Sequence, residues 1–244
     1  MSFPPFPQCL AGVLGVLIAA GAEASVREHF EQTVAFNPGG VFSIENQNGS
    51  IEIEAGNDST VRIEAEKEAK TEDGLRDLEI VVDGSGDRVS VRTVQHSRRG
   101  SGGVSYRIVL PAEAQIVVST ANGEVTVTGI HGRVQAESVN GALQIKDIAG
   151  EIEAETTNGS IRASYRTVEG GRHRFETTNG EVRVYLPADA GGDLDAETMN
   201  GSIEVDFPMN LTRTSRRHVQ GSFGSGGSSF AISTVNGSVS VLSN

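Results

Sequence analysis

Four glutamates recur at the same place in successive stretches of the sequence and are the first candidates for chemistry. Glu137, Glu155, Glu176 and Glu197 each stand three residues before an asparagine. Carboxylates held side by side repel one another, which raises the pKa of one of them and makes it a candidate general acid. Carboxylate oxygens also suit Ca²⁺. We favour a solvated acidic face over either role, so the sequence predicts no cofactor, and Ca²⁺ is the one cation that this column could hold.

Arginines are concentrated in two loops rich in glycine and serine. Arg98 and Arg99 lie in the first loop, and Arg216 and Arg217 lie in the second. Each loop leads into a strand-like segment, whereas a phosphate-binding loop opens a helix. The arginines could bind an anionic partner, such as a lipid headgroup or an acidic cell-wall polymer. Pairing with nearby glutamates explains them equally simply, and we favour that interpretation.

The sequence contains no recognisable catalytic signature. Its five histidines share no metal-ligand spacing, and the motifs of zinc proteases, thiol redox centres and serine hydrolases are absent. The single cysteine, Cys9, lies in an N-terminal apolar segment. A mature chain without that segment has no thiol nucleophile. We therefore predict that the protein is not an enzyme.

The glutamates are positioned by a repeat that is marked by the dipeptide Asn-Gly. In the second half of the chain its copies are 18, 18, 21, 21 and finally 36 residues apart. A recurring unit of this size is typical of repeat architectures. The copies are Asn48-Gly49, Asn122-Gly123, Asn140-Gly141, Asn158-Gly159, Asn179-Gly180, Asn200-Gly201 and Asn236-Gly237.

Apolar and polar residues alternate on both sides of each Asn-Gly. Around Asn158, Ile152 and Ala154 precede the dipeptide and Ile161 and Ala163 follow it, with polar residues between them. This period of two predicts two short strands per repeat, each with one buried face. We expect the asparagines to stack at one corner and to hydrogen-bond from repeat to repeat. We expect each glycine to supply a corner with φ above zero.

Outward charges favour stacking of repeat on repeat. If each repeat lies directly on the next, Arg133, Glu151, Arg172 and Asp193 alternate in sign at the strand spacing of about 4.8 Å. The four glutamates would instead form a like-charge ladder. We predict an all-β fold, a β-solenoid like a single-stranded parallel β-helix, with rungs of 18–21 residues and Asn-Gly corners. The alternative is an antiparallel β-sandwich or meander in which Asn-Gly forms hairpin turns.

The chain divides into a leader and one domain. Residues 1–24 have the apolar run and Ala-x-Ala cleavage site of a signal peptide, although no Lys or Arg precedes the run. We expect cleavage there, which leaves no transmembrane segment. Residues 25–244 form a single β-repeat domain. Within it, residues 25–110 hold N-terminal strands with a non-repeat insertion, including a hairpin that turns at residues 83–87, and residues 111–244 hold the regular repeats.

Composition agrees with a narrow core. Hydrophobic residues make up 37% of the chain, aromatic residues 5%, and tryptophan is absent. These values suit an interior of small aliphatic side chains better than the core of a globular enzyme. The formal net charge of −12 argues against nucleic acid as a partner.

The repeat text resembles a known family. The units SVNGALQI, TTNGSIRA, TTNGEVRV, TMNGSIEV and TVNGSVSV, with the closing run GSFGSGGSSFAISTVNGSVSVL at 221–242, look like the bacterial putative-adhesin family, a β-strand-repeat domain of unknown function in cell-envelope proteins. The resemblance covers about residues 40–244. It implies an all-β repeat fold and a non-catalytic envelope role, and it carries no catalytic residues over to this chain.

We therefore predict an exported, non-catalytic envelope protein, in the periplasm or at the cell surface, that serves adhesion, binding or scaffolding. Its partner would be an envelope polymer, a glycan or another envelope protein. Two alternatives remain open. A carbohydrate-active β-helix, a glycan binder or a lyase or hydrolase, would need clustered carboxylates in one groove. A structural module that assembles end to end would self-associate through exposed strand edges.

Overall fold

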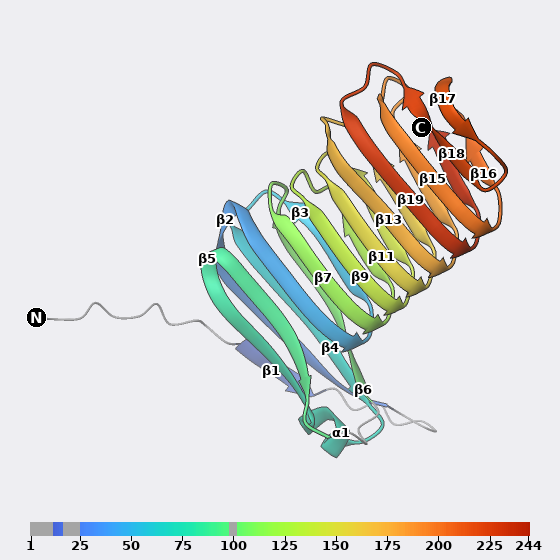
Figure 1. The fold of residues 1–244 in the computed structure, drawn as a ribbon. Helices are drawn as coiled ribbons and strands as arrows, with labels where there is room; N and C mark the ends of the chain where they lie inside the picture. Colours follow the sequence, from blue (N-terminus) through green and yellow to red (C-terminus); the bar gives the residue numbers. More distant parts are fainter. Residues whose placement is uncertain (1–11, 17–24, 98–101) are drawn as a thin grey trace, which may run out of the picture.

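The computed structural model describes residues 12–16, 25–97 and 102–244, and these residues form a long stack of β-strands (Figure 1). Most of the predicted signal peptide, residues 1–24, lies outside the described residues. Its described part is β1 (Gly12–Val16), which pairs antiparallel with the start of β2 (Val26–Asn48).

Two sheets run along the stack. In the first, visible at the front of Figure 1, neighbouring strands follow the order β5–β2–β7–β9–β11–β13–β19–β15–β18–β17. Its strands after β2 are β5 (Leu78–Gln95), β7 (Gln115–Asn122), β9 (Val134–Asn140), β11 (Ile152–Asn158), β13 (Gly171–Asn179), β15 (Gly192–Asn200), β17 (Met209–Thr214), β18 (His218–Phe223) and β19 (Ser228–Asn236).

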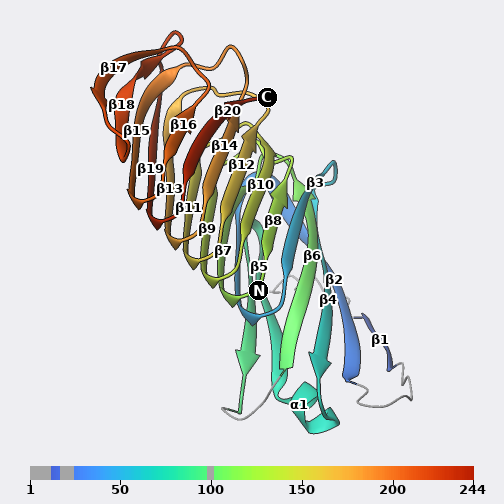
Figure 2. The same ribbon diagram turned by 90° about the vertical axis from the view of Figure 1, so that its right-hand side faces the viewer.

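The second sheet lies behind the first and faces the viewer in Figure 2. Its order is β2–β4–β6–β3–β8–β10–β12–β14–β20–β16. Its remaining elements are β3 (Ile51–Gly56), β4 (Thr60–Ala69), β6 (Gly102–Pro111), β8 (Val125–Thr128), β10 (Leu143–Ile148), β12 (Ile161–Tyr165), β14 (Val182–Leu186), β16 (Ile203–Val205) and β20 (Val239–Ser243), with the short helix α1 (Glu72–Arg76) beside β4 and β5.

The core is the space between the two sheets, and it is filled by aliphatic columns. Parallel pairing aligns Val125 with Leu143, Leu143 with Ile161, and Ile161 with Val182. All four side chains are buried. Because side chains alternate between the two faces of a strand, this register places every second residue inside and leaves the polar residues between them in solvent.

The all-β prediction is confirmed, and the pairing between repeats is parallel and in register. This is what stacked repeats require and what an antiparallel meander would not give. Antiparallel pairing among the described residues occurs at the two ends: among β1, β2, β4 and β6 at one end, and among β15, β18 and β17 at the other.

Stacking of each repeat directly on the next in chain order does not hold at the C-terminal end. The last repeat, β19–β20, does not follow β15–β16 at the end of the stack but lies between it and β13–β14. The hairpin predicted at residues 83–87 is present within β5: the chain reverses there, so that the His96 N–H donates to the Asp77 carbonyl at 3.0 Å, and the arm after the turn pairs parallel with β2. Gly84 and Gly86, with φ of 95° and 67°, lie at this reversal, where the left-handed backbone conformation favours glycine.

Candidate functional site

The Asn-Gly corners form one continuous line along the molecule. Each asparagine after Asn48 donates a side-chain hydrogen bond to the side-chain oxygen of the asparagine in the neighbouring rung, at 2.8–2.9 Å. The spatial order is Asn48, Asn122, Asn140, Asn158, Asn179, Asn236 and Asn200. The backbone ladder continues around the same corner, because every corner glycine except Gly201 donates its backbone N–H to an asparagine carbonyl of the adjacent rung, as Gly141 does to Asn158 at 3.1 Å.

The reason for glycine at these corners differs from the one predicted. A positive φ occurs at Gly49 and Gly123 but not at Gly141, Gly159, Gly180, Gly201 or Gly237. What excludes other residues is close approach: a Cβ at Gly159 would overlap the carbonyl oxygen of Gly141 in the rung below, and a Cβ at Gly180 would overlap that of Gly159. The corner is therefore a backbone-to-backbone contact that any side chain would open.

Buried hydroxyls stand just inside the corners and bind the same glycine carbonyls. Thr156 donates to Gly141 at 3.1 Å and Thr177 donates to Gly159 at 2.9 Å. Thr234 and Thr198 make the equivalent bonds to Gly180 and Gly237. These contacts tie the corners to the core and leave them with a structural role.

The predicted glutamate ladder is shorter than the sequence indicated. Glu137, Glu155 and Glu176 lie side by side on adjacent strands. Glu197 does not join them, because Ser233 of the last rung stands between Glu176 and Glu197. The Glu176 carboxylate accepts a hydrogen bond from Ser233 at 3.4 Å and pairs with Arg174 at 2.8 Å.

The ladder offers no metal cage. Within the described ranges, no group of three or more His, Cys, Asp or Glu side chains is placed to hold a metal ion. Glu137 and Glu155 lie on an exposed face of one sheet, where neighbouring carboxylates point outward in parallel. The geometry is that of a solvated acidic strip.

Of the two arginine-rich loops predicted from the sequence, the structure describes the arginines of the second. Arg98 and Arg99 lie outside the described residues. Arg216 and Arg217 lie at the turn between β17 and β18, both exposed, and line a shallow hollow of about 450 Å³ with Gly201 and Ser215. Neither forms an ion pair with another residue of the part that the structure describes, so the predicted pairing with glutamates does not account for them.

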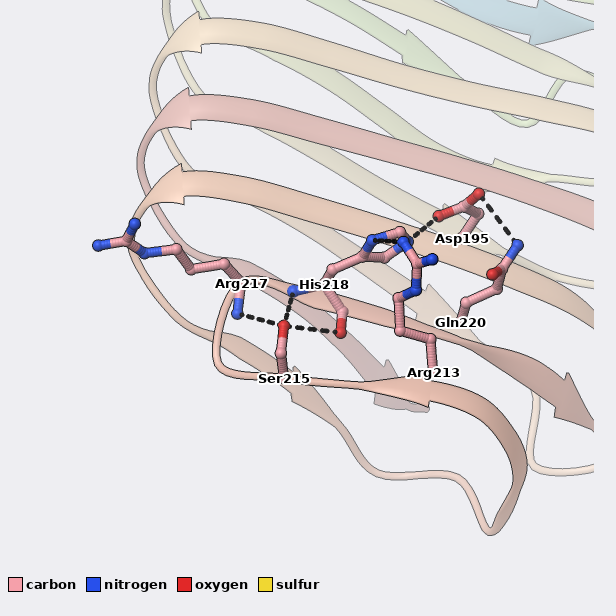
Figure 3. Close-up of polar contacts among 6 residues, drawn as sticks. All are labelled: Asp195, Arg213, Ser215, Arg217, His218 and Gln220. Atoms are coloured by element: carbon pink, nitrogen blue, oxygen red, sulfur yellow. Dashed lines mark hydrogen bonds and ion pairs between the residues drawn. The ribbon is translucent and has the colours of Figure 1, made fainter.

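A polar cluster beside that turn joins β15, β17 and β18 (Figure 3). The Nε2 atom of His218 lies 2.9 Å from an Asp195 carboxylate oxygen, and Nδ1 lies 3.2 Å from a guanidinium nitrogen of Arg213. Gln220 donates to the other Asp195 oxygen at 3.4 Å. Because arginine can only donate, Nδ1 accepts, and the proton of the neutral ring lies on Nε2, facing Asp195.

This cluster is not arranged for nucleophilic catalysis. The Ser215 hydroxyl accepts from the backbone N–H groups of Arg217 and His218, at 3.3 and 3.0 Å, and donates to the His218 carbonyl at 3.3 Å (Figure 3). It makes no bond to the imidazole, and both ring nitrogens are already occupied. A serine activated by histidine needs a direct bond between the two, so the cluster fixes the turn that carries Arg216 and Arg217.

A second histidine, His173, is buried in the core between β13 and its neighbours. Its ring stacks on Phe230 with centroids 4.7 Å apart, and the Tyr165 hydroxyl lies 2.8 Å from Nδ1. The Ile152 N–H also points to Nδ1, so the neutral ring carries its proton on Nε2. Nε2 makes no hydrogen bond of ordinary geometry within the described residues. Burial lowers the pKa of His173 to about 4, although the Gly170 backbone and the charge of Glu151 act to raise it.

Sequence reasoning missed the Asp195–His218–Arg213 cluster. The sequence signal was the basic loop itself, which contains Arg213 and His218. Asp195 lies close to His218 because β18 pairs antiparallel with β15. The repeat pattern in the sequence does not predict this pairing. Among the described residues, no helix is long and apolar enough to cross a membrane.

Comparison with known proteins gives a family and a fold. The Toastrack DUF4097 family profile matches residues 68–242. A crystal structure described as a putative cell adhesion protein from Clostridium sporogenes is 14% identical, with a TM-score of 0.52, and the match covers 89% of this chain and 100% of that one. At this identity the likeness establishes the fold alone.

A structure described as a putative adhesin from Bacteroides fragilis matches with a TM-score of 0.46 at 9% identity, covering 88% of this chain and 97% of that one. No match is found among the curated proteins.

Proposed function

This chain belongs to the Toastrack DUF4097 family, and from that premise we propose that it is a non-catalytic protein of the cell envelope that binds an anionic envelope polymer. The Clostridium sporogenes protein of similar fold is described as a putative cell adhesion protein, which supports an adhesin-like role. Export to the periplasm or the cell surface, after removal of residues 1–24, is part of the same proposal.

One observation carries the proposal: the exposed arginines at the β17–β18 turn have no internal partner. Arg216 and Arg217 are free of ion pairs among the described residues, while the groups around them, Asp195, His218 and Ser215, are engaged with one another (Figure 3). A fixed turn that presents unpaired guanidinium groups suits phosphate or carboxylate, because the planar fork of arginine matches both groups.

The acidic surface elsewhere supports specificity for this end of the stack. With a net charge of −12, most of the molecule repels a polyanion. The exposed side chains of Met199 on β15 and Leu211 on β17, which are 60% and 52% accessible, add apolar surface to this end of the stack. A polymer with anionic groups on an apolar or sugar backbone would meet both kinds of surface.

The two other candidate functions have less support. A glycan lyase or hydrolase needs paired carboxylates across a groove, and the described carboxylates of the ladder point outward from one face. End-to-end assembly rests on strand edges: among the described strands, β17 pairs only with β18, and β16 pairs only with β20. These edges are short or twisted into a hairpin, which is how soluble proteins limit strand addition.

Binding to a purified anionic envelope polymer at low and high salt tests the proposal. We expect Arg216→Ser/Arg217→Ser to weaken binding several-fold and to reduce its salt dependence, because each lost contact removes counterion release or charge pairing. The matched control is Arg162→Ser/Arg183→Ser, which removes the same charge from the other sheet. Equal losses in both variants would show non-specific attraction, and no loss in either would contradict the assignment.

A further inference from the structure

The last rung of the protein occupies a place that the chain order does not give it. Strand β19 is parallel to β13 on one side and to β15 on the other, and β20 lies between β14 and β16. In Figure 2, β20 accordingly stands between β14 and β16 rather than at the end of the sheet. The strands of the outer rung precede it in sequence, so the last rung closes a gap between two rungs that are made first.

The two rungs that flank the gap are already matched to each other. Asn179 and Asn200 both align with Asn236, and Val182 and Ile203 both align with Val239. If the last rung left, β15 could therefore pair with β13 without a register slip, and every inward residue would stay inward.

Outward charges across the gap are complementary as well. Arg172 and Asp193 both align with Ser229, and Arg174 and Asp195 both align with Ala231. In the present order these small neutral residues separate opposite charges by two strand spacings. Direct stacking of β15 on β13 would place the opposite charges side by side, where such pairs are favourable.

The connecting segments permit the rung to move. The link between β12 and β13, residues 166–170, advances the chain by one rung of the stack. The link between β14 and β15, residues 187–191, has the same length but advances the chain by two rungs, past the inserted last rung. The segment before β19 contains Gly226 and Gly227, where an added Cβ would meet nothing within 4 Å. This is an open hinge of small residues.

The seam, which is the contact between β13 and strand β19 of the last rung, contains a buried polar atom that lacks a good hydrogen bond. His173 stacks on Phe230 of β19 and is buried there, and its Nε2 makes no hydrogen bond of ordinary geometry within the described residues. A buried polar group without a hydrogen bond weakens the packing that surrounds it. The seam is therefore a weak point for release of the rung.

From this arrangement we propose that residues 228–243 form an exchangeable rung, which leaves its own gap and seats between β13–β14 and β15–β16 of a second copy of the chain. The partner is defined by the gap itself: the same segment of another copy re-forms the Asn236 bonds to Asn179 and Asn200 and the contact of Phe230 with His173. Such exchange keeps every interface and changes only the hinge, which is the condition for domain swapping. The proposal goes beyond anion binding and does not depend on it.

Disulfide trapping between differently tagged chains tests the exchange. Residues 25–244 contain no cysteine, so Arg172→Cys can be placed in one chain and Ser229→Cys in another. After the two proteins are mixed, incubated at high concentration and oxidised, a disulfide-linked heterodimer is expected, because the two positions are strand neighbours only if a rung has changed chains.

Two controls separate exchange from other association. Mixing Arg172→Cys with Asp193→Cys gives the collision background, because both positions lie on strands that flank the gap and do not change chains, so exchange does not make them neighbours. The double variant Arg172→Cys/Ser229→Cys in one chain should form an internal disulfide, which shows that the geometry allows the bond and also staples the rung in place.

The outcomes decide the proposal. Heterodimer above the Asp193→Cys background, together with loss of dimer on a sizing column in the stapled variant, supports exchange. Heterodimer yield equal to that background overturns it. Dimers that persist in the stapled variant also overturn it, because they must form through another surface, such as a strand edge.

Discussion

The middle of the stack and its C-terminal end use the same repeat but order it differently. From β7 to β14, rungs lie in space as they lie in sequence. At the C-terminal end, the rung at Asn236 is inserted before the rung at Asn200. The register is the same in both regions, so the columns of the repeat determine how any two rungs match but not which two become neighbours.

The two regions also differ in how tightly each rung is held. In the middle, each corner glycine lies between two other corner glycines, as Gly159 lies between Gly141 and Gly180. At the end, Gly201 contacts only Gly237, and β16 pairs on one side only. A rung with one free side can shift outward, whereas a rung in the middle cannot.

Alanine at corner glycines should give the largest effect and the sharpest contrast between the regions. We expect Gly159→Ala to lower the free energy of unfolding by roughly 3 kcal/mol or more, because its Cβ overlaps a carbonyl oxygen of the adjacent rung. Gly201→Ala should cost less, since the outer rung can move away. Urea melts of both variants measure the difference.

Arg162→Ala is the surface control for these melts and should stay within about 0.5 kcal/mol of the parent protein. Equal losses for Gly159→Ala and Gly201→Ala would mean that the outer rung is as constrained as the middle. Losses as small as that of Arg162→Ala would contradict the close contact at the corners.

Acid should destabilise the protein through His173, at the boundary between the two regions. Its pKa is lowered from 6.5 to about 4 in the folded state, mainly by burial. The folded state therefore binds fewer protons than the unfolded state between these values, so stability is retained above about pH 6.5 and lost as the pH falls toward 4. The shift corresponds to about 3 kcal/mol.

The groups that face His173 identify the control. They are Tyr165, whose own pKa is raised by burial, and Glu151, whose charge acts to raise the pKa of the histidine. His173→Leu removes the titrating ring and should flatten the stability profile between pH 6.5 and 4. Asp147, whose pKa is lowered by Arg166, loses its contribution only as the pH falls below about 3.8. An unchanged slope in His173→Leu would contradict the assignment.

Much of the regular stack could be predicted because its information is local. The alternation around Asn158 fixes which residues face inward, and the spacing of the asparagines indicates a common corner. The role of the corner glycines could not be predicted, because a close approach between Gly159 and Gly141 exists only after stacking. The sequence pattern showed that glycine recurs at the corners, but it did not show that close backbone contact is the reason.

The C-terminal end could not be predicted because its information is non-local. The wide spacing between Asn200 and Asn236 signalled an irregularity, but it did not say that β17 and β18 would fold back along β15 and that the next rung would insert. The contact of Asp195 with His218 depends on that path. So does the separation of Glu176 from Glu197 by Ser233.

Removal of single ladder asparagines should give an intermediate effect that again depends on position. Asn158 both donates to Asn140 and accepts from Asn179, whereas Asn200 only donates, to Asn236. We expect Asn158→Ala to cost about 1–2 kcal/mol and Asn200→Ala about half as much, because a typical hydrogen bond contributes about 1 kcal/mol. Thermal or urea unfolding measures both, and equal losses would show that the ladder is not the source.

The smallest predicted effect concerns the neutral residues of the inserted rung. Ser233→Glu would place a carboxylate between Glu176 and Glu197 and so complete the acidic ladder. Like charges directly opposite each other are unfavourable, so we expect a loss of up to about 1 kcal/mol that shrinks as salt is added. Ser229→Glu is the matched control, because its neighbours Arg172 and Asp193 have opposite charges and should nearly cancel. A salt-insensitive loss in Ser233→Glu, or equal losses in the two variants, would mean that the added side chain acts through packing. The contrast in charge between the middle of the stack and the inserted rung would then have no energetic consequence.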